Sequence, residues 1–405
     1  MPRLLFSVPR PGVLGVRALV SLTAILALLA MACGSPAPPA SQAPASGQPA
    51  AAPKTPIKIG AMFSTTGPLA GAGAEALPGA QVFADEINAK GGINGRLVEL
   101  VVHNDESKPE GGLSGVRKLV DQDKVVAIVG PVSVAVSTAM TPILDEKKVP
   151  MVGLLGQFGE MTPYSFSAIP VTGVTVPHIQ YAKSKGLKTA ALIAQAGAIA
   201  ESIKRTVQPD LEKEMTLVAF EQIQPTDTDI TPILAKLRSQ GVEFVFVPTS
   251  GQQAAMAAKN FKQIAYPGLF STTHQNANAT FIDLVGDAAD IVIINGTKIA
   301  VYKDLPASDP DKARVSAFAD AYLKKTGKEP SLISAVGYDM MLSVTEAIKT
   351  AGDNPEKIKE ALEAQKGLKG LNGVINRSPK EHNGMEAQWL LMGVDAAQKR
   401  FVIKK

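Results

Sequence analysis

Residue types that usually perform catalysis are sparse and scattered in this chain of 405 residues. The segment 71–76 has the letters of a dinucleotide-binding fingerprint, but eight residues separate it from the strand expected to end at Met62. Neither a Gly-x-x-x-x-Gly-Lys phosphate loop nor a Gly-x-Ser-x-Gly nucleophile motif occurs. The four histidines are far apart and lack the His-Glu-x-x-His spacing of a zinc site: His103, His178, His274 and His382. We therefore expect no enzyme, no metal ion and no cofactor.

The single cysteine, Cys33, lies directly after an apolar segment, 18–31, which three arginines precede. That segment is about 14 residues long, whereas a membrane-spanning helix needs roughly 20, so it is typical of a signal peptide. A small residue followed by cysteine at this place resembles the lipobox of bacterial lipoproteins. We expect residues 1–32 to be a signal peptide and Cys33 to be the lipidated first residue of an extracytoplasmic protein. The alternative is an ordinary secretory signal.

Residues 33–56 are expected to form a tether between the lipid and a folded body. Residues 34–56 hold seven prolines and one charged residue, Lys54, a composition that cannot bury a core. Residues 1–32 contribute three arginines and no acidic residue, so their removal lowers the formal charge from +4 to +1. The mature chain is therefore not basic enough to indicate a nucleic-acid partner.

From Ile57 onward, short apolar runs alternate with segments of helical periodicity, which predicts an α/β fold with parallel sheets. The alternation restarts after Pro170, so we expect two doubly wound lobes. Lobe 1 is placed at 57–171 plus 300–374, and lobe 2 at 172–299 plus 375–405. The main expected helices are 75–90, 132–147, 200–214, 252–263, 311–326 and 332–350, and a final strand pair is expected near 388–394 and 400–403.

Ligands of doubly wound sheets bind beyond the carboxyl ends of the strands. Six loops are expected at those ends: 63–73, 130–133, 154–160, 195–200, 248–252 and 271–276. Glu160 is the only charged residue in all six. The sequence therefore predicts a ligand site that is poor in charge.

Several segments of the body resemble the Leu/Ile/Val-binding-protein family: 57–60 (IKIG), 67–70 (GPLA), 86–96 (EINAKGGINGR), 126–131 (VAIVGP), 227–229 (DTD) and 285–290 (VGDAAD). The resemblance covers about residues 57–405. It implies a type I periplasmic binding protein fold, with two lobes joined by three crossovers around a small-molecule ligand. It also implies a monomer that delivers this ligand to an ABC transporter permease without altering it. The alternatives are a ligand-sensing lipoprotein of a signalling system and, less favoured, an extracytoplasmic enzyme.

The resemblance also indicates where the ligand contacts fall. In amino-acid-binding members, hydroxyls of two first-lobe loops hold the ligand carboxylate, and an acidic residue of the second lobe holds the ammonium. At the acidic position this chain has His274, and at a hydroxyl position it has Val134 beside Ser133. The candidate ligand-binding residues are Thr65, Thr66, Ala72, Ser133, Val134, Leu155, Gln157, Phe158, Ile199, Ser250 and His274.

A buried ammonium without a carboxylate partner costs several kcal/mol. We therefore expect a ligand without a free α-ammonium, such as an aromatic or other organic acid or an amide. Residues 377–379 (RSP) and 381–384 (EHNG) resemble a subgroup of the family that handles aromatic acids and amides. One alternative stays open for Ser133, which could cap its own helix instead of touching a ligand. Trp389 is interpreted as core or hinge packing.

Overall fold

The computed structural model describes residues 55–154, 161–169 and 173–404. The expected signal peptide, Cys33, most of the tether, and Leu155, Gln157, Phe158 and Glu160 lie outside these residues. Among the described residues, no helix is long and apolar enough to cross a membrane. Two large sheets organise this part of the chain, and each is called here a lobe together with the helices that cover it.

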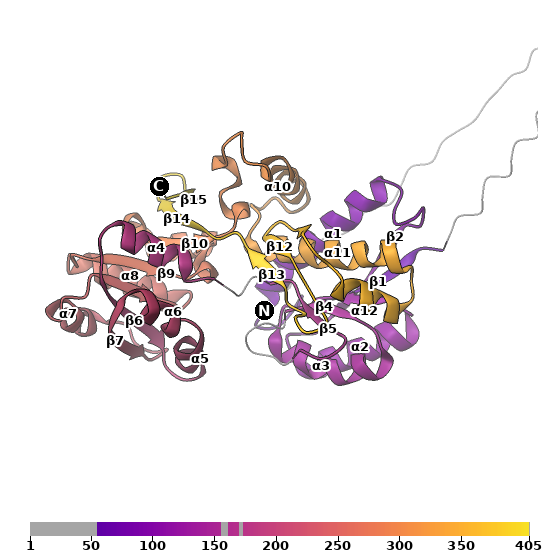
Figure 1. The fold of residues 1–405 in the computed structure, drawn as a ribbon, viewed down its shortest axis with the longest axis horizontal. Coiled ribbons are helices and arrows are strands. Elements are labelled where there is room, and N and C mark those ends of the chain that lie inside the picture. The colour runs from indigo at the N-terminus through magenta and orange to yellow at the C-terminus, as the bar shows by residue number, and fades with distance from the viewer. Residues whose placement is uncertain (1–54, 155–160, 170–172, 405) are drawn as a thin grey trace, which may run out of the picture. The chain divides into compact units, whose positions relative to one another are not determined.

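The first lobe is built on a five-stranded parallel sheet with the order β2-β1-β3-β4-β5. Within β3, Ala127 and Val129 pack in a core with α1, α10 and α11, while Ile128 packs on the opposite face with α2 and α3. The strands are β1 Ile57–Phe63, β2 Val98–Asn104, β3 Ala127–Val129, β4 Met151–Gly153 and β5 Ser165–Ser167. The helices are α1 Ala70–Ala89, α2 Pro109–Arg117, α3 Val134–Lys147, α10 Lys312–Thr326, α11 Leu332–Ala351 and α12 Pro355–Glu363. Figure 1 shows α1 beside α11, far apart in the chain.

The second lobe is built on a seven-stranded sheet with the order β15-β14-β10-β9-β8-β6-β7, in which only β14 and β15 run antiparallel to their neighbours. Its strands are β6 Thr189–Gln195, β7 Thr216–Ile223, β8 Phe244–Val247, β9 Leu269–Thr272, β10 Ile293–Gly296, β14 Leu390–Asp395 and β15 Arg400–Ile403. Its helices are α4 Val176–Ser184, α5 Ala198–Thr206, α6 Gln208–Glu214, α7 Thr231–Ser239, α8 Gln252–Gln263 and α9 Ala279–Val285.

The five parallel strands of each sheet have the same spatial order when they are numbered along the chain, namely 2-1-3-4-5. This is a doubly wound order, and its crevice opens where the first and third strands of the set end. The expected α/β fold with parallel sheets is confirmed. In each lobe the loops that follow the first and third strands are therefore the natural place for a ligand.

The chain passes between the sheets after β5, after β10 and before β14. A small sheet of β11 Leu368–Lys369, β12 Gly373–Ile375 and β13 Met385–Ala387, which the sequence did not predict, precedes the third passage. The loop between β12 and β13 stays with the first lobe, because the Arg377 guanidinium donates to the carbonyl oxygen of Ser167 at 2.7 Å. We therefore propose to move the lobe boundary from 374–375 to 388–389.

Two expected helices differ from the structure. The helix expected at 75–90 begins earlier, at Ala70, so the loop expected at 63–73 is short. The single helix expected at 200–214 is two helices, α5 and α6, that meet at Val207. Pro209 explains the break, because proline has no N–H to donate and its ring clashes with the carbonyl of the preceding turn.

Candidate ligand-binding site

The loop after β1 forms one part of the carboxyl edge of the first sheet, the edge at which its strands end. Asn104, the last residue of β2, holds this loop: its Oδ1 accepts from the Thr65 N–H at 2.9 Å, and its Nδ2 donates to Thr66 Oγ1 at 2.8 Å. Both threonines are exposed. The structure thus places the two candidates together at this edge, with the Thr66 hydroxyl already engaged by Asn104.

The loop after β2 braces the same edge, and sequence reasoning missed it. Asp105 is fully buried; its Oδ1 accepts from Ser64 Oγ at 2.5 Å and from the Ser107 N–H at 2.8 Å. Asp105 Oδ2 has no hydrogen-bond partner among the described residues. Because this carboxylate has no exposed surface, it serves as a brace and not as a ligand contact. The polar run that follows β2 was the signal that could have revealed it.

Ala72 lies in the first turn of α1, partly buried against the hydrophobic core of the first lobe. Close packing explains the adjacent Gly73, the second glycine of the fingerprint-like segment. A Cβ at Gly73 would lie 1.9 Å from the Ser64 carbonyl oxygen, so only glycine lets α1 approach the end of β1. Gly73 therefore serves helix packing, and no nucleotide site is needed to explain it.

Ser133 and Val134 lie at the start of helix α3, which follows strand β3. Ser133 is the N-cap: its Oγ accepts from the Val136 N–H at 3.3 Å, and the residue is buried. Ser133 therefore caps its own helix, while the hydroxyl keeps its own proton for one further bond. The first N–H groups of a helix have no intrahelical partner and attract anions, so this turn can receive a carboxylate.

In the second lobe, Ile199 and Ser250 lie on the loops that follow β6 and β8. Ile199 belongs to the first turn of α5 and is exposed, and Ser250 is exposed just before α8. Each follows or precedes a glycine with positive φ, Gly197 at 91° and Gly251 at 64°. These two candidates therefore lie at the carboxyl edge of the second sheet, accessible to a small molecule.

A buried amide, Asn276, ties the edge loops of the second sheet together. Its Nδ2 donates to the Thr249 carbonyl and to Thr272 Oγ1, both at 2.8 Å, and its Oδ1 accepts from the Gly251 N–H at 2.8 Å. Asn276 thus fixes the loop after β8 against the loop after β9. Sequence reasoning did not single it out, because its partners are distant in the chain.

His274 begins the turn that follows β9 and is partly buried. Its backbone N–H donates to Asn295 Oδ1 at 2.8 Å, and its Nδ1 lies 3.1 Å from Thr273 Oγ1. Its ring centroid lies 4.9 Å from that of Trp389. Burial lowers the pKa of His274 to about 4, so the imidazole is neutral at pH 7 and offers one donor and one acceptor.

A second histidine, His178, lies buried beneath this edge. Its Nδ1 lies 2.6 Å from Ser271 Oγ, which donates its own proton to the Ile293 carbonyl at 2.9 Å. His178 Nε2 has no hydrogen-bond partner among the described residues. Burial lowers the pKa of His178 to about 4, so this imidazole is also neutral at pH 7.

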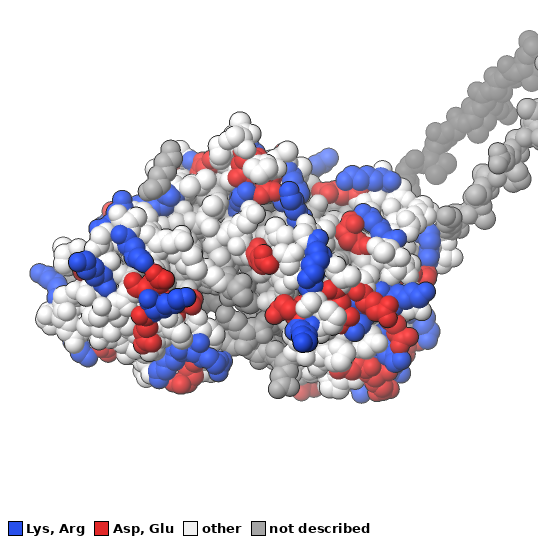
Figure 2. Space-filling view, viewed as in Figure 1, with Lys and Arg blue, Asp and Glu red and all other residues white. Residues whose placement is uncertain are grey.

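The edge loops of the second sheet differ in charge. The loops after β6, β8 and β9 contain no acidic residue, whereas the loop after β7 carries Asp227 and Asp229. Within the described ranges, no group of three or more His, Cys, Asp or Glu side chains could hold a metal ion. On the face shown in Figure 2, basic and acidic side chains are interspersed and form no field of one sign. The loops after β6, β8 and β9 therefore offer hydroxyls, amides and a neutral imidazole.

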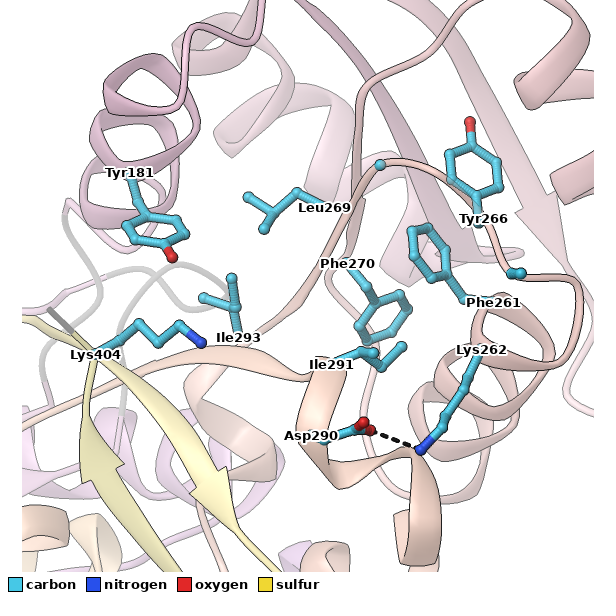
Figure 3. Close-up of a pocket in the computed structure, with 12 residues that line it drawn as sticks. Tyr181, Phe261, Lys262, Tyr266, Leu269, Phe270, Asp290, Ile291, Ile293 and Lys404 are labelled. Atoms are coloured by element: carbon cyan, nitrogen blue, oxygen red, sulfur yellow. Dashed lines mark hydrogen bonds and ion pairs between the residues drawn. The ribbon is translucent and has the colours of Figure 1, made fainter.

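An open hollow of about 390 Å³ lies elsewhere on the second lobe (Figure 3). Tyr181, Leu269, Ile293 and Lys404 surround it, with the Lys262–Asp290 ion pair at one side. Leu269 and Ile293 are the first residues of β9 and β10, so the hollow lies at the opposite, amino edge of the sheet. It is separate from the candidate ligand site.

Comparison with known proteins shows the family of the chain. Residues 56–399 match the family profile described as periplasmic binding protein. The chain belongs to this family. Among periplasmic binding proteins it is 25% identical over 321 residues to the leucine-, isoleucine-, valine-, threonine- and alanine-binding protein of Pseudomonas aeruginosa, covering 76% of this chain and 82% of that protein.

Two solved structures show the same fold. A putative branched-chain amino acid ABC transporter protein from Rhodospirillum rubrum aligns with a TM-score of 0.72 at 21% identity, over 86% of this chain and 100% of the other. A branched-chain amino acid transporter substrate-binding protein from Streptococcus pneumoniae, in complex with isoleucine, aligns with a TM-score of 0.67 at 23% identity, over 86% and 99%.

These findings confirm the expected type I periplasmic binding protein family and support a ligand-binding role. The related proteins are extracytoplasmic solute-binding proteins, which favours a binding protein over an enzyme.

Proposed function

We propose that this protein is a lipid-anchored extracytoplasmic receptor that captures a small organic molecule between its lobes and delivers it to an ABC importer permease. The family supports capture and delivery. The apolar signal segment that ends at Cys33 supports the anchor, and the proline-rich tether gives the body room to reach a permease in the membrane. Closure of the lobes on the ligand would present the surface that the permease recognises.

We further propose that the ligand lacks a free α-ammonium. The observation that carries this proposal is that the loops after β6, β8 and β9 hold no acidic residue and that His274 stands near the position that the family resemblance assigns to an acidic residue. The buried side-chain amide of Asn276 makes its hydrogen bonds to Thr249, Gly251 and Thr272 of the protein itself. An ammonium enclosed there would lose its water without gaining a carboxylate, at a cost of several kcal/mol.

An organic acid or amide suits the groups that remain. The first turn of α3 offers backbone N–H groups and the Ser133 hydroxyl to a carboxylate or an amide oxygen. His274 and Ser250 offer neutral hydrogen bonds from the second lobe. Aromatic acids and amides are therefore the first classes to test.

A thermal-shift panel tests the ligand class. The full chain, purified in detergent, is heated with phenylacetate, benzamide, 3-methylbutanoate, L-leucine and L-phenylalanine. We expect the acids or the amide to raise Tm while the amino acids do not. Micromolar binding of leucine, measured by calorimetry, would show that the ligand assignment is wrong and that the receptor binds amino acids.

The anchor has its own test. Intact-mass measurement of the mature protein should show acyl chains on Cys33 and no residue before it. The variant Cys33→Ser should lack them and leave the membrane fraction. A wild-type chain without acyl chains would contradict the lipid anchor and leave the capture function untouched.

A further inference from the structure

Trp389 is the only tryptophan of the chain, and the strand register places it at the ligand edge. It precedes β14, whose first residue, Leu390, pairs with Gly296, the last residue of β10. Because β14 runs antiparallel to β10, its beginning lies where the parallel strands end. Trp389 therefore lies at the same edge of the second sheet as His274, although it follows no parallel strand.

The contacts of Trp389 join this edge to the first passage between the sheets. The ring centroids of Trp389 and His274 are 4.9 Å apart and the rings are tilted by 42°. On another side, a Cβ built on Gly173 would lie 3.8 Å from the indole Cδ1. The backbone of His274 is held by Asn295, whose Oδ1 accepts from the His274 N–H, and the His274 ring contacts Thr273 Oγ1 through Nδ1. The two rings thus form a corner whose position the fold fixes.

The exposure of these rings distinguishes them from core residues. Trp389 packs against the hydrophobic cluster of the first lobe, yet it is only partly buried, and so is His274. By contrast, Phe244 and Phe246 of the second sheet are fully buried, as expected for rings that serve only core packing. A partly open ring pair at the carboxyl edge is instead placed to meet a bound molecule.

We propose that Trp389 and His274 form an aromatic wall of the ligand site that selects ligands with a flat, unsaturated group. This inference rests on the proposed receptor function. Flat rings attract one another through offset or edge-to-face packing beyond the gain from buried area, and a saturated ring of equal size cannot reproduce that packing. The wall is expected to favour a planar ring over its saturated counterpart by about tenfold.

Two probes that differ only in ring planarity test the wall: 3-phenylpropanoate and 3-cyclohexylpropanoate. Calorimetry on the full chain should give about tenfold tighter binding of the phenyl compound. Trp389→Leu should remove this preference, whereas Trp389→Phe should keep most of it. Tyr181→Leu is the matched control, because Tyr181 lies at the amino edge of the same sheet and should leave the preference unchanged. A merely structural tryptophan would alter both affinities together and leave their ratio unchanged.

Fluorescence gives a readout that needs no variant. With one tryptophan in the chain, 3-phenylpropanoate should shift or quench the emission of Trp389 in the wild type. Three results would each contradict the aromatic-wall proposal: equal binding of both probes, an unchanged ratio of their affinities in Trp389→Leu, or binding without any change in emission. Binding of L-leucine alone would contradict the aromatic wall but preserve the receptor function. Absence of binding by both probes and by the whole thermal-shift panel would overturn both.

Discussion

The two lobes share one strand order but differ in the ionisable groups that they bury. The first lobe buries Asp105 at its edge, Asp339 within α11 and the whole of Arg377. Within the described residues, the second lobe buries His178 and the amide of Asn276 but no Asp, Glu, Lys or Arg, and its acidic edge residues Asp227 and Asp229 lie in the loop after β7. A doubly wound edge can therefore be built with either chemistry, and the ligand class depends on which residues the loops carry.

The largest expected effect concerns the charged interior of the first lobe. Arg377 donates to the carbonyl oxygens of Ser167 and His382, at 2.7 and 3.0 Å, and also to Ser343 and Gln365. Arg377→Met leaves these buried acceptors without a donor and should lower the free energy of unfolding by about 3 kcal/mol or more. Urea denaturation measures this loss.

The exposed Arg205 provides the control for that variant. Arg205→Met should change the free energy of unfolding by less than about 0.5 kcal/mol. If the two arginine variants unfold at the same urea concentration, the first lobe does not depend on its buried charge.

The next effect is a pH dependence that the second lobe carries. The pKa of His178 is lowered from 6.5 to about 4 by burial, so its neutral form is favoured in the folded state. The contribution of His178 to the free energy of unfolding is full above pH 6.5. It is lost as the pH falls towards 4, by up to about 3 kcal/mol. The buried Asp339 acts in the opposite sense. Burial raises its pKa to about 7, so its contribution is best below about pH 4 and is lost as the pH rises through 7.

The variant His178→Asn separates the pH dependence of His178 from that of Asp339. Urea denaturation between pH 7 and pH 4.5 should show a smaller acid loss in this variant than in the wild type, while Asp339 acts equally in both. His103→Asn in the first lobe should retain the wild-type loss. The same acid loss in wild type and His178→Asn would refute the neutral interior of the second lobe.

A smaller effect is expected from the amide that joins the second-lobe loops. Asn276→Ala leaves the Gly251 N–H and the Thr249 carbonyl without their partner and should cost about 2 kcal/mol. The neighbouring Gln275 is exposed, and Gln275→Ala should be nearly neutral. Equal stability of both variants in urea would mean that the loops hold without Asn276.

The smallest effect concerns the N-cap of α3 in the first lobe. Ser133→Ala should lower the free energy of unfolding by about 1 kcal/mol, and Ser133→Asn should restore most of it, since asparagine caps equally well. Thermal melts of the three proteins give the comparison. An alanine variant as stable as wild type would show that the cap is dispensable.

Much of the fold could be predicted from hydrophobic periodicity. The expected helix at 252–263 agrees with α8 at both ends, because its apolar face and its flanking turns point to the same limits. The break near Pro209 and the early start of α1 were missed, because both depend on backbone contacts that periodicity does not show. The small sheet β11–β13 was missed because its strands are two or three residues long.

The site was predictable only where it follows parallel strands. Thr65, Ser250 and His274 could be placed because each comes directly or closely after such a strand. Trp389 reaches the same edge at the start of an antiparallel strand, a direction that sequence pattern did not give. The partners of Asn276 lie at a distance in the chain, so its role depends on the folded loops.

The central claim is that the loops after β6, β8 and β9, which hold no acidic residue, select against an ammonium. L-Phenylalanine and 3-phenylpropanoate differ only in that group, so titration calorimetry of the full chain with this pair tests the claim directly. The account predicts that 3-phenylpropanoate binds at least about 100-fold more tightly, since an unpaired buried charge costs several kcal/mol. Equal or tighter binding of phenylalanine would contradict it.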